Sequence, residues 1–407
     1  MDKPEKAPVD KEEKVFRSQT YRLYPTAAQE VELNRWLVWF NVIWNRLVGL
    51  REENQKEVIK LPKAERKGKY IGLKQLSKHI TSARHLVPEI NTTCSYCGFS
   101  IARRFVRCIS SYLSLYKRWV KEGCNPKRKP EAPGYKRLDE YTVIDNEQTS
   151  SLRLRSGKKF GRFDCGKMKD LKVRLHRPLP GELRSASIMK CPDGWYVKMS
   201  YIPKDPLVVK PTTKTVGVNL GVRNIIARTD GEKVPIPQER WQRIAERIAR
   251  LDKIASRRQK GSNRYKKIMA LRRKAYCHWV KSRDHFLQKW SFRMARDFSE
   301  IALEKMDLAK MIEESGGTKC RKTGVKAKTI ANAAVGKFVT YLKRKMEERS
   351  HVLWENNPAD TTRTCSKCGF VNAKIPLHIR VFKCVQCGHA EDREFNAAKN
   401  NEDKANL

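Results

Sequence analysis

Four cysteines near the end of the chain have the spacing of a metal site. They form two Cys-x-x-Cys pairs, Cys365 with Cys368 and Cys384 with Cys387, and fifteen residues separate the pairs. Each pair turns the backbone tightly, so its two sulfur atoms can face one ion, and two pairs supply the four thiolates of a structural zinc site. The spacing therefore predicts a ribbon that binds one zinc ion, in preference to four free thiols.

Acidic residues follow this ribbon directly. Glu391, Asp392 and Glu394 lead into Asn396-Ala397-Ala398, which begins a helix-like run. This join resembles the end of TnpB proteins, the transposon-encoded relatives of type V CRISPR effectors. In that family the ribbon interrupts a RuvC-like nuclease domain, and the last catalytic carboxylate lies just before an Asn-Ala-Ala motif.

The resemblance implies three catalytic positions. The family has an aspartate in a Gly-x-Asp-x-Gly stretch on the first strand of the domain, and this chain has Asn219 there. Glu304 matches the second carboxylate and Glu394 the third, while Asp392 lies on the family's other acidic position. Such carboxylates hold two divalent ions, offset the repulsion between them and position a water for attack on a phosphate.

Two of these positions depart from the family pattern. Asn219 lacks the charge and the second oxygen of aspartate, and Glu394 is one methylene longer. Because metal sites tolerate a misplacement of only about 0.5 Å, we predict that catalytic magnesium binds poorly and that the chain has no nuclease activity. Asp230 and Asp392 are the carboxylates that could substitute. The two departures on an intact scaffold look like the nuclease-dead TnpB-like repressors called TldR.

The overall charge indicates a long polyanion as the partner. The chain has 407 residues, a formal net charge of +43 and 40% hydrophobic residues, which is typical of two or three folded domains. This charge excess argues against a small-molecule substrate and favours nucleic acid over an anionic membrane surface. The sequence has no apolar run of eighteen residues and no secretion signal, and its twelve cysteines favour a reducing compartment. We expect a cytoplasmic, nucleoid-associated protein without a membrane partner.

The amino-terminal elements read as a strand followed by a helical lobe. Residues 16–24 alternate like a strand, and Thr26 caps a long apolar helix. The stretch Tyr21-Arg22-Leu23-Tyr24-Pro25-Thr26 before such a helix is similar to the TnpB amino terminus. Residues 140–210 then consist of short alternating runs separated by glycine and proline, which predicts a small antiparallel barrel that the first strand completes.

A second Cys-x-x-Cys pair lies within the helical lobe. Cys94 and Cys97 form a single knuckle before a helix predicted over residues 99–120. A single knuckle supplies only half of a zinc site, so we favour free thiols here. Cys108 lies on the same predicted helix, and a three-thiol site that includes it stays open.

The chain from Lys214 onward has the order of an RNase H-like fold. A strand hairpin starts at Thr215, a strand ends at Glu304, a helix follows over residues 327–349, and another strand leads into the ribbon. Residues 312–326 are rich in glycine and lysine, which predicts a flexible segment. The fold class is therefore α+β and multidomain. The predicted domains are a wedge barrel (1–26 and 135–212), a recognition lobe (27–134), a RuvC-like domain (213–357 and 391–407) and a zinc ribbon that contacts target nucleic acid (358–390).

A long helical pair over residues 238–298 carries most of the candidate contacts with nucleic acid. Residues 241–290 contain sixteen Lys or Arg against three Asp or Glu, with aromatic residues between them. So few acids cannot pair with so many bases, which favours a surface that binds a phosphate backbone. The predicted nucleic acid contacts are Tyr21, Arg22, Tyr24, Lys74, Lys78, Arg257, Arg258, Lys266, Lys267, Arg272 and Arg273.

These observations predict an RNA-guided, sequence-specific DNA-binding protein. Its partners would be a guide RNA and double-stranded DNA that has a short motif beside the target, because base pairing would supply the specificity and the protein would hold the heteroduplex. Bound at a promoter, such a complex would repress transcription by blocking RNA polymerase. The alternatives are an active or weakly active nuclease of the same family and an unguided zinc-ribbon protein that binds nucleic acid.

Overall fold

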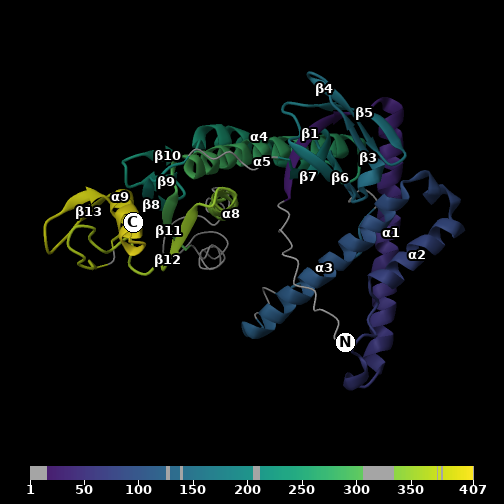
Figure 1. Ribbon diagram of the computed structural model, residues 1–407, viewed down its shortest axis with the longest axis horizontal. Coiled ribbons are helices and arrows are strands. Elements are labelled where there is room, and N and C mark those ends of the chain that lie inside the picture. The colour runs from purple at the N-terminus through teal and green to yellow at the C-terminus, as the bar shows by residue number, and fades with distance from the viewer. Residues whose placement is uncertain are drawn as a thin grey trace, which may run out of the picture. The chain divides into compact units, whose positions relative to one another are not determined.

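The computed structural model describes residues 16–124, 129–137, 141–204, 211–305, 334–373, 375–376 and 379–406. The chain divides into two compact units, residues 1–206 and 207–407. Figure 1 labels the helices and strands of each. The segment predicted to be flexible, residues 312–326, lies outside the described residues.

A seven-stranded sheet forms the first part of the amino-terminal unit. Its strand order is β2-β6-β7-β1-β5-β4-β3, and the paired strands are antiparallel. The outer strand β3 contacts β6, so the sheet nearly closes into a barrel. The strands are β1 (Arg17–Tyr24), β2 (Val143–Asn146), β3 (Leu152–Arg155), β4 (Phe160–Cys165), β5 (Met168–Arg174), β6 (Gly181–Cys191) and β7 (Gly194–Pro203).

The first strand completes this sheet, as the sequence predicts. β1 lies between β5 and β7, although about 120 residues separate it from the next strand along the chain. Its alternation turns Gln19, Tyr21 and Leu23 toward the interior, where Phe163 and Val197 are fully buried. The central strand of the barrel-like sheet therefore precedes the whole helical lobe in the chain.

Three long helices form the lobe between β1 and β2. They are α1 (Ala27–Lys60), α2 (Leu73–Leu86) and α3 (Ser95–Lys121), with short 3-10 helices at Lys63–Glu65, Pro88–Thr92 and, after β2, at Thr149–Ser151. Thr26 caps α1 in a capping box with Gln29. The indole of Trp44 packs edge-on against Phe105 of α3, with ring centroids 5.2 Å apart. These contacts fix α3 against α1 and so fix where α3 begins.

The carboxyl-terminal unit contains a five-stranded sheet of order β10-β9-β8-β11-β12. The hairpin strands β8, β9 and β10 pair antiparallel, whereas β8, β11 and β12 run parallel. The strands are β8 (Thr215–Leu220), β9 (Asn224–Arg228), β10 (Lys233–Pro235), β11 (Glu300–Glu304) and β12 (Val352–Asn356). The predicted order of strand hairpin, strand, helix, strand and final helix is confirmed.

Helices cover both faces of this sheet. One face packs against α5 (Asn263–Asp297) and α8 (Val335–Glu347), through a core that includes Leu287, Phe338 and Leu342. The other face carries the last helix, α9 (Arg393–Lys404), which contacts β8, β9 and β11. Helix α4 (Gln238–Ser256) pairs with α5, and the ribbon contains β13 (Val381–Lys383) and β14 (Ala390–Asp392). The predicted α+β multidomain class is confirmed.

Candidate functional site

Two parallel strands place Asn219 and Glu304 side by side. Leu303 of β11 pairs with Val218 of β8, so the next residues along, Glu304 and Asn219, lie at the same level on neighbouring strands. Adjacent strands are about 4.8 Å apart, and residues at equivalent positions in parallel neighbours point to the same face. Both side chains are half-buried. The sheet register therefore brings together two of the three predicted catalytic positions.

Helix α9 covers the face on which Asn219 lies. A Cβ atom at Gly217 would be 2.2 Å from the carbonyl oxygen of Ala398 and 2.7 Å from Cβ of Glu402. Because side chains alternate along a strand, Asn219 faces the same way as Gly217. The amide of Asn401 also donates a hydrogen bond to the carbonyl of Val218, at 3.0 Å. Glycine at position 217 thus lets the helix backbone approach the strand.

The amino terminus of α9 carries the other two predicted residues. Asp392 is the N-cap, and its carboxylate accepts a hydrogen bond from the backbone N–H of Glu394 at 2.9 Å. The carboxylate of Glu394 accepts a hydrogen bond of 2.6 Å from the side-chain amide of Asn224. Asn224 begins β9, just beyond the end of β8, so the start of α9 lies at the Asn219 end of that strand.

Basic side chains also contact these carboxylates. The amine of Lys233 lies 2.7 Å from Asp392 and 3.7 Å from Glu394, and the guanidinium of Arg380 lies 3.7 Å from Glu394. Lys233, Arg380 and Asn224 were not predicted from the sequence. The signal that could have found Lys233 is its hairpin register opposite Ala227, which itself pairs with Asn219.

The electrostatics of Glu304 differ from those of a surface carboxylate. Burial raises its pKa, and the positive charge of Lys404 partly offsets this effect. Asp230, the other substitute considered, accepts hydrogen bonds from Arg228 at 2.9 and 2.6 Å. Its position after β9 places it at the opposite end of the hairpin from Asn219. Asp230 therefore pairs with Arg228 and lies away from Asn219.

The oxygen donors near α9 suit a hard divalent cation. Carboxylates and the amide oxygen of asparagine are ligands that Mg²⁺ and Mn²⁺ accept, so Asn219, Glu304 and Glu394 fit such an ion chemically. Among the His, Cys, Asp and Glu side chains of the described residues, however, only the four ribbon cysteines bring three or more donor atoms within 4.8 Å of one another. A cation bound at these oxygens would therefore have to draw the carboxylates closer together.

The four ribbon cysteines form a compact group. The sulfur of Cys365 lies 3.7 Å from that of Cys387, and the sulfur of Cys368 lies 3.6 Å from that of Cys384. Four thiolates that each lie about 2.3 Å from a tetrahedral zinc have nearly this spacing. After each pair comes a glycine with positive φ, Gly369 at 74° and Gly388 at 69°, which closes the turn. The group is compatible with one structural zinc.

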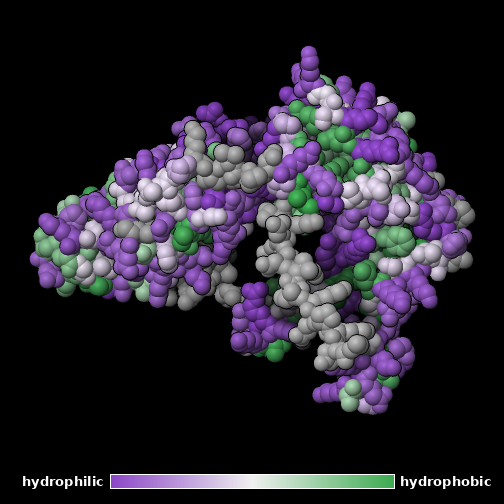
Figure 2. Space-filling view, in the orientation of Figure 1, coloured by the Kyte–Doolittle hydropathy of each residue, from purple (hydrophilic) through white to green (hydrophobic). Residues whose placement is uncertain are grey.

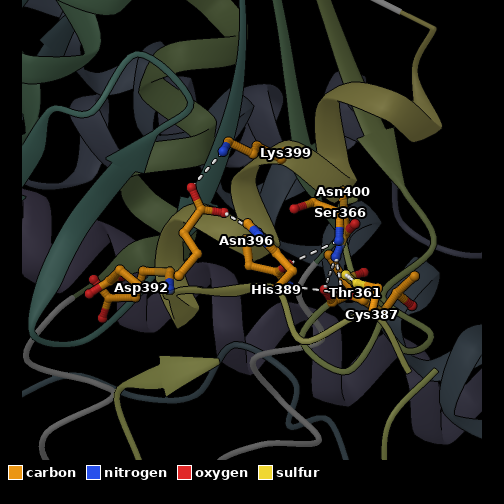
Figure 3. Close-up of polar contacts among 12 residues, drawn as sticks. Thr361, Ser366, Cys387, His389, Asp392, Asn396, Lys399 and Asn400 are labelled. Atoms are coloured by element: carbon orange, nitrogen blue, oxygen red, sulfur yellow. Dashed lines mark hydrogen bonds and ion pairs between the residues drawn. The ribbon is translucent and has the colours of Figure 1, made fainter. Parts of the chain in front are cut away.

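Asparagines of α9 connect the helix to the first cysteine pair. The amide of Asn396 donates to the carbonyl of Thr364 at 2.8 Å, and its oxygen accepts from the backbone N–H of Ser366 at 3.0 Å (Figure 3). Asn400 donates to the same Thr364 carbonyl at 2.7 Å and to that of Thr361 at 2.8 Å. The asparagine of the Asn-Ala-Ala motif thus binds the ribbon. The two alanines of the motif are fully buried.

The predicted nucleic acid contacts on β1 differ in exposure. Tyr21 is 1% exposed and donates a hydrogen bond to Gln19, whereas Tyr24 is 39% exposed. The guanidinium of Arg22 donates to the hydroxyl of Tyr196 at 2.7 Å and stacks on the rings of Tyr24 and Tyr196. In this structure Tyr21 supports the barrel interior and only Tyr24 presents its ring to solvent.

Most of the predicted lysine and arginine contacts are exposed. Arg272 is half-buried and forms an ion pair with Asp252, which joins α5 to α4. Figure 2 shows a mostly hydrophilic visible face with scattered hydrophobic patches. The exposed candidates are Lys74 and Lys78 of α2, Arg257 and Arg258 after α4, and Lys266, Lys267 and Arg273 of α5.

Comparison with known proteins identifies the family. Three family models match the chain: a helix-turn-helix domain at residues 17–60, a probable transposase at 198–314 and a Cas12f1-like TNB domain at 336–401. The chain belongs to the TnpB family. In this chain, the helix-turn-helix model covers β1 and α1, and the transposase model covers β8 to β11. The TNB model covers the ribbon and most of α9.

Two similar proteins and one solved structure extend this result. A protein of Streptomyces pristinaespiralis named as an RNA-guided DNA endonuclease is 28% identical over 239 residues, which is 56% of this chain and 55% of that protein. The Escherichia coli K12 protein InsQ, named in the same way, is 20% identical over 93% of this chain and 90% of its own. The mini-RNA-guided endonuclease CRISPR-Cas_phi3 shares the fold, with a TM-score of 0.50 and 10% identity over 97% of this chain and 93% of its own.

The prediction that this chain lacks nuclease activity is wrong. The relatives are named as endonucleases, the matching transposase model spans Asn219 and Glu304, and neither relative is named as a repressor. The prediction assumed that the missing charge of Asn219 and the added methylene of Glu394 together prevent binding of the cation. An asparagine oxygen is itself a ligand for hard cations, and a longer glutamate can be accommodated by a shift of the helix that carries it.

Among the helices in the described part of the chain, none is long and apolar enough to cross a membrane.

Proposed function

We propose that this protein is an RNA-guided DNA endonuclease. A guide RNA would pair with one DNA strand, and the carboxyl-terminal unit would cut the DNA with a divalent cation. The observation that carries the proposal is the packing of α9 on β8. It sets Glu394 at the end of β8, the strand on which Asn219 lies beside Glu304 of β11. The names of the matched relatives support the same activity.

Each residue of the candidate site has a distinct role in this proposal. A bound divalent cation would supply an activated water and stabilise the charge that develops on the phosphate. Asn219, Glu304 and Glu394 would hold it through their oxygens, and Asn224 would orient Glu394 through its 2.6 Å hydrogen bond. Lys233 now pairs with Asp392 and Glu394, so it would turn away or contact the DNA phosphate when the cation binds.

The nucleic acids would be held mainly through their backbones. The exposed lysine and arginine side chains along α4 and α5 suit a guide RNA or an RNA–DNA heteroduplex, which such proteins recognise by shape and charge. In this proposal the barrel is the wedge domain, the helices of residues 27–134 form the recognition lobe that reads a short motif beside the target, and the ribbon contacts target nucleic acid with its zinc-bound loops.

Repression of transcription is a second role that binding alone would provide. A guided complex that stays on a promoter blocks RNA polymerase for as long as it persists, whether or not it later cuts. A reporter gene with the target placed in its promoter would test this role. Expression should fall when the matching guide is present and should stay unchanged with a mismatched guide.

Cleavage with a defined guide is the decisive experiment. RNA that copurifies with the protein would be sequenced, and a plasmid with the matching target would be incubated with the complex and Mg²⁺ or Mn²⁺. We expect cutting that requires the match, and loss of cutting in Glu304→Ala and Glu394→Ala with target binding retained. Asp230→Ala, at the far end of the hairpin, is the matched control and should still cut.

Two results would contradict the proposal. A complex that binds its matched target but leaves it intact with either cation would exclude the nuclease activity. A protein that copurifies with no discrete RNA and binds all DNA equally would instead indicate an unguided zinc-ribbon protein.

A further inference from the structure

Three buried cysteines meet where the helical lobe joins the barrel. Cys94 and Cys97 lie at the start of α3, and Cys165 ends β4; their side chains are 3%, 1% and 0% exposed. The neighbouring thiols of Cys165 and Cys94, together with burial, raise the pKa of Cys97 well above its usual value. The amide of Asn146 donates to the sulfur of Cys165 at 3.4 Å. The candidate catalytic site and the ribbon use none of these thiols.

The tight turn between β4 and β5 closes over Cys94. Gly166 in this turn has a φ of 58°, and a Cβ atom there would lie 2.3 Å from the sulfur of Cys94. Its neighbour Lys167 is exposed, so the turn that covers Cys94 lies at the protein surface. A local opening of this turn would admit a small neutral oxidant to Cys94.

Hydrogen bonds at the start of α3 stabilise the thiolate of Cys94. The thiol of Cys97 is the strongest contributor, and the backbone N–H groups of Cys97, Tyr96 and Lys167 add to it. Together they outweigh burial and lower the pKa of Cys94 to about 6. At neutral pH the sulfur is thus mostly ionised, which is the form that reacts with oxidants.

A metal site is not the best explanation of this cluster. Cys108, the third ligand considered from the sequence, is eleven residues after Cys97 on α3, which is about 16 Å along a helix. The cluster Cys94, Cys97 and Cys165 does not bring all three sulfurs within 4.8 Å in the described structure, whereas the ribbon cysteines do so. Two neighbouring thiols of a Cys-x-x-Cys pair are instead the arrangement of a redox-active dithiol.

We propose that Cys94 and Cys97 form a peroxide-sensitive redox switch that becomes a disulfide. The Cys94 thiolate attacks one oxygen of hydrogen peroxide, the O–O bond breaks, and the departing hydroxide takes up a proton as water. Cys97 then attacks the sulfur of the resulting sulfenic acid and the S–O bond breaks. The departing hydroxide takes up the proton of the Cys97 thiol and leaves as a second water. In total, two thiols and one peroxide yield one disulfide and two waters.

The disulfide would loosen the contact between α3 and the barrel. It removes the thiolate that accepts hydrogen bonds from Lys167, and it draws Cys97 away from Cys165. The Cys165–Met168 turn would then lose a polar contact with the start of α3. We expect faster amide hydrogen exchange in this turn after oxidation, with full reversal by dithiothreitol.

Peptide mass spectrometry on the full-length protein with its copurified RNA tests the proposal. After treatment with equimolar hydrogen peroxide, free thiols are alkylated and each cysteine peptide is quantified. The Cys94–Cys97 disulfide should form before the exposed Cys124 is oxidised, and dithiothreitol should remove it. In Cys97→Ser, dimedone should trap the sulfenic acid on Cys94. Cys124→Ser is the matched control and should form the disulfide at the unchanged rate.

Three outcomes would overturn the switch. Both thiols could stay reduced while Cys124 reacts, the disulfide could join Cys97 to Cys165 instead, or a second zinc per chain could protect the pair. Should Cys97→Ser fold poorly, Cys165→Ser retains both reactive thiols and must still form the Cys94–Cys97 disulfide.

Discussion

At the scale of single residues, the environment decides what a side chain can do. Asn219 sits beside Glu304 on parallel strands, and its amide oxygen is a usable but uncharged ligand. Lys345 is a charged residue that is 8% exposed between α8 and α5, where its amine donates to Gln288 and, at 2.8 Å, to Ser291. Both positions allow a test by one substitution.

Asn219→Asp should strengthen the candidate cation site. It adds a negative charge and a second oxygen where the cation would bind, and ligand charge raises the affinity for hard cations, here on the order of tenfold. The measurement is the Mg²⁺ concentration at which guided cleavage reaches half of its maximum, which should fall. Asn224→Ala, which removes the donor to Glu394 without adding a charge, is the contrasting variant and should raise that concentration. Equal Mg²⁺ dependence in native protein and Asn219→Asp would remove Asn219 from the site.

Lys345→Met should change how stability depends on pH. Burial lowers the pKa of Lys345 from 10.5 to about 8, with Arg344 adding to the effect, so the unfolded chain binds more protons than the folded one between these values. Native stability therefore gains as pH rises from about 8 to 10.5, and the methionine variant lacks this gain. The free energy of unfolding of the variant minus that of native protein should fall across this window. Lys343→Met, on the exposed side of α8, should show a much flatter difference.

At the scale of elements, α9 organises the carboxyl-terminal unit. It packs on β8 through Gly217, holds the first cysteine pair through Asn396, and presents Glu394 at its amino terminus. One helix thus connects the ribbon to the candidate catalytic strands. Its two contact surfaces can be disturbed separately.

Gly217→Ala should push α9 away from β8. The added Cβ would lie 2.2 Å from the backbone oxygen of Ala398, which cannot move alone, so the cost should be about 1–3 kcal/mol of stability. Chemical denaturation measures the loss, and hydrogen exchange should show that α9 is its location. Gly134→Ala, where nothing lies within 4 Å of the added Cβ, should have little effect. Similar losses in both variants would contradict close packing of the helix.

Asn396→Ala should weaken the zinc ribbon without touching a cysteine. It removes the hydrogen bonds to Thr364 and Ser366 that fix the first pair, a loss of about 1–3 kcal/mol. Zinc should pass to a chelator faster than from native protein, while Cys365→Ser should lose the metal outright. Lys367→Ala, an exposed position within the same pair, should release zinc at the native rate. Zinc loss at the native rate from Asn396→Ala would mean that α9 does not support the site.

At the scale of the whole molecule, the net charge of +43 dominates the interaction with solvent and partners. Many of the bases are exposed, and few acids are available to pair with them. Arg272 and Arg273 are adjacent on α5, yet only the first has an ion pair with Asp252. Binding of a polyanion should therefore depend on which lysine and arginine side chains can neutralise its phosphates and so release its counterions.

RNA binding should weaken steeply with salt. For about six phosphate contacts, the affinity should fall roughly a thousandfold between ~50 and ~200 mM salt. Arg273→Gln should lower the slope of log affinity against log salt by about one, because one phosphate contact is lost. Arg272→Gln should lower it less, since Asp252 already neutralises that charge. A flat response to salt would contradict backbone binding along α4 and α5.

The sequence by itself determined the features that depend on neighbouring residues. The two cysteine pairs, each followed by a glycine with positive φ, and the Thr26 cap of α1 all form within a few residues of chain. The alternation of β1 and the strand and helix order of the second unit were likewise readable, because burial of one face imposes its period on the sequence.

Only the tertiary structure decided which distant residues meet. Glu394 accepts a hydrogen bond from Asn224, which lies 170 residues earlier in the chain. Cys97 lies next to Cys165 and not next to Cys108, and Arg272 forms an ion pair with Asp252. The prediction of no nuclease activity was wrong because it judged Asn219 and Glu394 by their residue types. How well a side chain binds a cation also depends on the backbone that carries it and on its neighbours. Such contacts follow from the packing of helices on a sheet. The periodicity of the sequence shows which face of an element is buried, but not against which other element that face packs.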